Sequence, residues 1–167
     1  MEYYEERDDL HISIIDYQDC YGYASLQITK NELRTNLTVI KDSLINNFKN
    51  TTTLNQNDEM LVEEISEAEA ELKKARSEGD INKINQALKK RTLAKSKLQI
   101  TRAEISIAQN KEKSKILEYD RDFKISHPLL NKMEIEKIRN KYDISINKLH
   151  KNNQGIESTI NEIKNTT

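Results

Sequence analysis

Basic side chains between residues 83 and 115 are the groups in this sequence most able to do chemistry, because clustered cations can bind phosphates. Ten Lys and Arg residues occur in this stretch with only two acidic residues. Six of them form a candidate basic face: Lys89, Lys90, Arg91, Lys95, Lys97 and Arg102. No aromatic residue lies between residues 49 and 118, so this stretch cannot stack on nucleic-acid bases. We therefore favour pairing of these basic residues with acidic side chains of the same chain. Nucleic-acid binding is our alternative function.

The stretch just before this basic one is acidic. Residues 57–80 carry nine acidic residues against three basic ones, and the charge changes sign at Gly79-Asp80. Glycine commonly ends a helix and aspartate commonly begins one. If the chain folds back there, an acidic helix lies along a basic one, and each exposed pair contributes about 0.2–1 kcal/mol. The pattern predicts an antiparallel helical hairpin and disfavours parallel self-pairing.

Residue types that commonly carry catalysis or bind metals are scattered. His11, His127 and His150 lie in three separate segments without the spacing of metal ligands. Cys20 is the only cysteine and has no adjacent base to activate it. The three glycines are too far apart to form a phosphate-binding loop. We predict no catalytic, cofactor-binding or metal site, and hence a protein that is not an enzyme.

The N-terminal segment 1–28 combines acidic charge with aromatic residues. It has seven acidic residues against Arg7, and it holds five of the seven tyrosines: Tyr3, Tyr4, Tyr17, Tyr21 and Tyr23. Aromatic side chains are enriched at binding hot spots, so these tyrosines are the predicted partner-binding residues. Packing of some of them against a helical core is the alternative, and the surface around Ile107 to Phe123 would then be the binding site. Residues 10–28 fit both a helix and a short hairpin; we favour the helix, and the hairpin is the alternative.

The rest of the chain, residues 29–167, predicts a helical bundle. Three glycines and one proline leave few sites for tight turns, which favours long helices. Thr29 and Glu32 form a predicted capping box, and Pro128 suits the first turn of a new helix. Polar residues 50–57 are predicted to form a loop. The expected helices span about 29–49, 57–78, 81–125 and 128–165.

The expected hairpin has an apolar seam. On the first arm the seam residues are Leu61, Ile65, Ala68, Leu72 and Ala75, and on the second arm they are Ile84, Leu88, Leu98 and Ile105, flanked by Ala87, Ala94 and Ala108. Folding about Gly79-Asp80 would place Leu61 opposite Leu98. It would also bring Glu64 near Lys95, and Glu67 and Glu71 near residues 89–91. A second stripe, Leu93, Ile100 and Ile107, predicts that the second arm touches another helix.

We therefore predict an all-α fold, an elongated antiparallel coiled-coil hairpin within a small helical bundle. This architecture resembles the small coiled-coil stalk, chaperone and adaptor proteins of bacterial secretion machines and phage particles, a likeness of architecture alone. It implies a non-enzymatic structural, adaptor or chaperone-like subunit that binds proteins through helix faces, with self-association left open. No apolar run approaches the ~20 residues of a membrane span, and the acidic N-terminus is unlike a signal peptide. The expected location is the cytoplasm.

Overall fold

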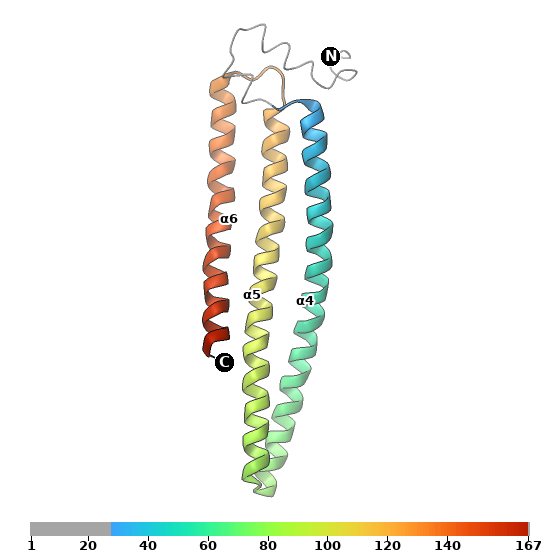
Figure 1. Ribbon diagram of the computed structural model, residues 1–167, viewed down its shortest axis with the longest axis vertical. Coiled ribbons are helices and arrows are strands. Elements are labelled where there is room, and N and C mark those ends of the chain that lie inside the picture. Colours follow the sequence, from blue (N-terminus) through green and yellow to red (C-terminus); the bar gives the residue numbers. More distant parts are fainter. Residues whose placement is uncertain (1–27, 167) are drawn as a thin grey trace. The chain divides into compact units, whose positions relative to one another are not determined.

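The computed structural model describes residues 28–166, and its regular structure consists of helices. These are α4 (Lys30–Glu78), α5 (Ile81–Ile125) and α6 (Lys132–Thr166) (Figure 1). The predicted all-α fold class is confirmed for this part of the chain. The described part divides into two compact units: unit 1 comprises residues 28–46 and Lys111–Lys151, and unit 2 comprises Asn47–Asn110 and residues 152–166.

In unit 1, side-chain caps decide where two helices begin. The Glu32 amide donates to Thr29 Oγ1 at 2.9 Å and the Thr29 amide donates to Glu32 Oε2 at 3.3 Å, which is the predicted capping box of α4. The prediction that the last helix begins at Pro128 is wrong. Asn131 Oδ1 instead accepts the Glu134 amide at 2.8 Å, so Asn131 caps α6.

The predicted loop at residues 50–57 is wrong as well, because α4 runs through it without interruption. The hydroxyls of Thr51, Thr52 and Thr53 each donate to the carbonyl four residues earlier, at 2.8, 2.9 and 3.2 Å. A threonine in a helix can satisfy its hydroxyl in this way, so a run of threonines does not end the helix. The stretch contains neither glycine nor proline to break it.

In unit 2, the turn between α4 and α5 lies at the predicted Gly79-Asp80. Gly79 has a φ of 70°, a conformation that glycine adopts without a steric penalty. Its amide donates to the Arg76 carbonyl at 3.3 Å, and the Asp80 amide donates to the Ala75 carbonyl at 3.2 Å, which closes the end of α4. Asp80 Oδ1 accepts the Lys83 amide at 3.2 Å and so caps α5.

Small side chains occupy the α5 side of the contact between α4 and α5 in unit 2. On α4 the predicted seam residues Leu61, Ala68, Leu72 and Ala75 are buried and Ile65 is half-buried, whereas the buried residues of α5 recur every seven positions as Ala87, Ala94, Thr101 and Ala108. The alanines of α5 were expected to flank the seam, whereas its larger apolar residues at positions 84, 88, 98 and 105 are only half-buried. Small residues let two helix backbones approach closely. Asn47 Nδ2 reaches the backbone carbonyl of Ala108 at 2.8 Å, in keeping with such an approach.

The second stripe on α5 is buried only in part. Ile107 is buried, Ile100 is half-buried and Leu93 is 47% exposed. The backbone carbonyl of Ile107 accepts a hydrogen bond at 3.5 Å from Asn153 of α6, so the stripe meets a second helix at that end. In unit 1 the apolar core is a separate cluster of Ile28, Ile125 and Ile135, with Leu33, Leu130 and Ile138 packed around it.

Candidate partner-binding surface

The five tyrosines predicted to bind a partner, Tyr3, Tyr4, Tyr17, Tyr21 and Tyr23, lie outside the described residues, as do His11 and Cys20. Their predicted role stays a prediction. His127 accepts the Leu129 amide at 3.3 Å through Nδ1, a bond within the turn that follows α5. Within residues 28–166, no group of three or more His, Cys, Asp or Glu side chains is placed to hold a metal ion.

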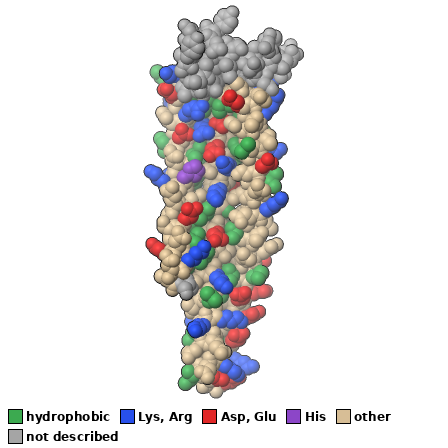
Figure 2. Space-filling view, viewed as in Figure 1, with side chains coloured by type: hydrophobic (Ala, Val, Ile, Leu, Met, Phe, Trp, Pro, Cys, Tyr) green, Lys and Arg blue, Asp and Glu red, His purple; other side chains and the backbone are tan. Residues whose placement is uncertain are grey.

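The six residues of the predicted basic face do not form one free cationic surface. Lys90 pairs with Glu71 at 3.1 Å and with Glu67 at 4.0 Å, and its hydrogen bond to Glu71 raises its pKa. Arg102 pairs with Asp58 at 2.8 Å, and this hydrogen bond raises its pKa. Figure 2 shows acidic and basic side chains intermixed on the viewed face at the end that carries the Gly79 turn.

These ion pairs can be compared with the cross-helix contacts expected from the sequence. The predicted position of Glu67 and Glu71 beside the Lys89–Arg91 cluster is confirmed. The expected proximity of Glu64 to Lys95 yields no ion pair; the charge of Glu64 instead contributes to the raised pKa of Lys90. Lys89, Arg91, Lys95 and Lys97 form no ion pair with another residue of the described part.

An apolar stripe on α5 is the best candidate for a binding surface in unit 1. Ile116, Tyr119 and Phe123 follow one another at spacings of three and four, so they share one face of the helix. Ile116 is 51% exposed and Phe123 is 56% exposed, while Tyr119 is half-buried. The rings of Tyr119 and Phe123 are 6.2 Å apart at a tilt of 38°, so they form one continuous aromatic surface. We call these three residues the α5 stripe.

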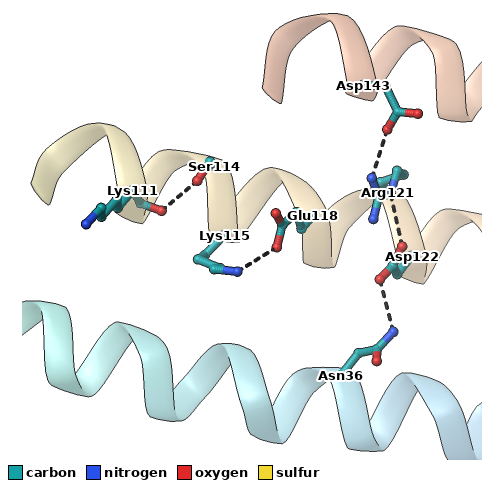
Figure 3. A network of polar contacts seen from close by, with 8 residues as sticks. All are labelled: Asn36, Lys111, Ser114, Lys115, Glu118, Arg121, Asp122 and Asp143. Atoms are coloured by element: carbon teal, nitrogen blue, oxygen red, sulfur yellow. Dashed lines mark hydrogen bonds and ion pairs between the residues drawn. The ribbon is translucent and has the colours of Figure 1, made fainter. Parts of the chain in front are cut away.

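A network of polar contacts on α5 holds the neighbouring helices of unit 1 in place (Figure 3). Arg121 donates to Asp143 of α6 at 2.8 Å and to Asp122 at 3.0 Å, and Asp122 accepts from Asn36 of α4 at 3.1 Å. Burial lowers the pKa of Arg121, but its hydrogen bonds to Asp143 and Asp122 outweigh this and the pKa is raised. These residues connect α5 to both neighbours and so position the α5 stripe.

Charged residues next to Tyr119 and Phe123 of the α5 stripe are paired within the protein. Lys115 Nζ lies 3.1 Å from Glu118 Oε2, and Lys124 Nζ lies 3.3 Å from Asp120 Oδ2. The hydroxyl of Tyr142 on α6 donates to Asp120 and accepts from Lys124, which also lies over the Tyr142 ring. Because these charges already have partners, the part of the stripe at Tyr119 and Phe123 offers mainly apolar contact. That favours an apolar protein surface as its ligand over a polyanion.

The Tyr142 contact predicts a dependence of stability on pH. The hydrogen bond from Tyr142, followed by that from Lys124, lowers the pKa of Asp120. A carboxylate with a lowered pKa stabilises the fold above its unfolded-state pKa, near 4, and this contribution is lost as the pH falls below that value. Replacing Tyr142 by Phe should therefore reduce the loss of melting temperature between pH 6 and pH 3. The contribution of the Asp120 contact to the free energy of unfolding should not exceed about 1 kcal/mol, because Asp120 is half exposed.

Tyr119→Phe is the matched control for this measurement. It removes the hydroxyl of another tyrosine of unit 1, one for which no contact to Asp120 is found. Thermal melts of the three proteins across this pH range give the comparison. Equal pH dependence of Tyr142→Phe and wild type would show that the Asp120 contact does not contribute to stability.

A shallow pocket in unit 2 is a weaker candidate than the α5 stripe. It has a volume of about 300 Å³ between α4 and α5, and its lining includes Met60, Leu61, Ile100 and Thr101. Glu64, Lys97 and Glu104 also line it.

None of the helices in residues 28–166 has a segment both long and apolar enough to cross a membrane. The chain matches no protein-family model, no curated protein and no solved structure.

The signal that identifies the α5 stripe was present in the sequence as the spacing of Ile116, Tyr119 and Phe123. The alternative binding surface predicted from the sequence spans Ile107 to Phe123, which includes the stripe. The sequence did not separate the stripe from buried residues of the same helix such as Ile107 and Ile125. That distinction depends on where α4 and α6 pack.

Proposed function

We propose that this protein is a non-enzymatic coiled-coil adaptor or structural subunit that binds another protein through a helix face. The observation that carries the proposal is the exposed α5 stripe, since large apolar side chains grouped on one helix face mark interaction sites more often than single exposed ones do. An amphipathic helix with apolar residues at matching spacing would fit it. The proposed compartment is the cytoplasm.

The surrounding contacts support a rigid binding face. Arg121 and Asp122 are bonded to α6 and α4, and Asp122 is 6% exposed. A surface held by such contacts loses little conformational entropy on binding. In the proposed mechanism the polar network keeps the helix in place, and the stripe supplies the apolar contact area. Membership of a bacterial secretion machine or phage-like particle remains a proposal based on the expected architecture alone.

A photo-crosslinking experiment tests the proposal. The chain has two phenylalanines, Phe123 in the stripe and Phe48 on α4, which is 73% exposed. A photoreactive phenylalanine analogue placed at position 123 in the native host should crosslink to one discrete protein, and the same analogue at position 48 should not. The mass of the product distinguishes another protein from a second copy of this chain.

Substitution in the stripe measures the strength of the contact. The Ile116→Ser/Phe123→Ser double variant should bind the crosslinked protein at least ~10-fold more weakly, because apolar anchors dominate binding energy. Ile144→Ser, at an isoleucine of α6 that is 69% exposed, is the control and should bind as wild type. Circular dichroism should show unchanged helix content in both. Equal affinity of the double variant and wild type would contradict the proposal.

Nucleic-acid binding stays a second candidate because of the four basic residues of α5 that have no ion pair in the described part. The same crosslinking experiment at position 95 addresses it. A nuclease-sensitive product there, with no protein product at position 123, would make nucleic acid the better ligand. Binding through these bases should also weaken steeply with salt.

A further inference from the structure

Two buried asparagines face each other between α5 and α6 in unit 2. Asn110 is 9% exposed and Asn153 is 8% exposed. Asn110 Nδ2 donates to Asn153 Oδ1 at 2.9 Å, and Asn153 Nδ2 donates to the Ile107 carbonyl at 3.5 Å. Both amides are therefore paired inside a contact between helices.

The position of Asn153 on α6 is one at which an apolar residue is expected. The buried residues of α6 recur every seven positions as Ile146, Asn153 and Ile160. The predicted series of every seventh residue, Ile135, Tyr142, Leu149, Ile156 and Ile163, is buried at its first two members and half-buried at the others. Asn153 thus replaces one member of an isoleucine series that faces the neighbouring helix.

Stability does not explain this choice of residue. A buried amide is unfavourable unless it is hydrogen-bonded, and two well-packed leucines would bury more apolar surface. Unlike leucines, the paired amides make a shifted arrangement of the two helices unfavourable. If α6 shifted by seven residues along α5, Ile146 or Ile160 would take the place of Asn153 opposite Asn110. Each asparagine would then be buried against apolar side chains without a partner.

We infer that the Asn110–Asn153 pair fixes the register of α6 on α5 within unit 2, at the expense of stability. A single buried asparagine sets register and partner choice in helical coiled coils in the same way. The inference concerns which arrangement the helices adopt, so it stands independently of the proposed binding function and of the α5 stripe.

Single and double substitutions test the pair. Asn110→Leu and Asn153→Leu should each lower the melting temperature by roughly 3–10 °C, because each leaves the other amide without its partner. The double variant should recover the wild-type melting temperature or exceed it. Asn152→Leu, at the exposed neighbour of Asn153, is the matched control and should change it by less than about 2 °C.

The register itself is read from isoleucine methyl resonances. Ile107 and Ile160 should each give one resonance in the wild type and more than one in the double variant, because the leucine pair no longer penalises a shift. A double variant that is more stable and still gives one resonance for each would overturn the inference.

A measurement on the wild-type protein covers the case in which a variant fails to fold. The side-chain amide protons of Asn110 should exchange with solvent at least ~10-fold more slowly than those of exposed Asn152. Equal exchange rates would show that the pair is not formed in solution, and the inference would fail.

Discussion

Replacing Ile135 by Ala should destabilise unit 1 more than any other single change considered for this protein. Ile135 has no exposed surface and belongs to the cluster with Ile28 and Ile125. Removing its outer carbons loses their burial and leaves a cavity, at a cost of about 2–5 kcal/mol. For a chain of this length that corresponds to a fall in melting temperature of roughly 5–15 °C.

The same substitution at Ile144 is the control, because it removes the same atoms from the same helix. Ile144 is 69% exposed, so Ile144→Ala should change stability by no more than about 0.5 kcal/mol. Thermal and urea unfolding followed by circular dichroism measure both variants. Similar melting temperatures for the two would show that the cluster around Ile135 is not the core of unit 1.

Replacing Ala68 by Leu should destabilise unit 2, although it adds apolar surface. Ala68 is fully buried in the contact between α4 and α5, and Ala94 is the buried alanine in the corresponding series on α5. A leucine there forces side chains or backbones apart, which costs typically about 1–3 kcal/mol. The expected fall in melting temperature is roughly 3–10 °C.

Ala70→Leu is a control only two residues away on the same helix. Ala70 is exposed, and leucine and alanine are both good helix formers, so this change should be close to neutral. The contrast tests directly how tightly the seam is packed at Ala68. If that site had room for a larger side chain, Ala68→Leu would be tolerated and the melting temperatures of both variants would match the wild type.

The proposed binding role does not depend on these core effects. The stripe residues Ile116 and Phe123 are about half exposed, whereas Ile135 and Ala68 are buried. Variants at the stripe residues should weaken binding with little change in stability. Variants at the buried residues should lower stability with little change in binding. Measuring both quantities on both sets therefore tests the division between core and surface on which the proposal rests.

Local signals in the sequence determined most of the helix boundaries. Gly79 and Asp80 provide the end of one helix and the cap of the next, and Thr29 and Glu32 cap α4 through their own side chains. Such bonds form between residues a few positions apart, so the sequence is enough to predict them. Local signals also misled where two of them competed. The threonines after residue 50 lie within α4 because their hydroxyls donate to backbone carbonyls of the same helix. Asn131, and not Pro128, marks the start of α6.

The tertiary structure alone decided which of several apolar series became the core and which stayed on the surface. On α5, Ala87 and Ala94 are buried although Leu88 and Leu98 are more hydrophobic, because the close packing of α4 selects small side chains. The exposure of Phe123 and the pairing of Asn110 with Asn153 likewise depend on where neighbouring helices pack. Periodicity shows that a helix has apolar faces. Which face is buried depends on partners distant in sequence, and no local pattern contains that information.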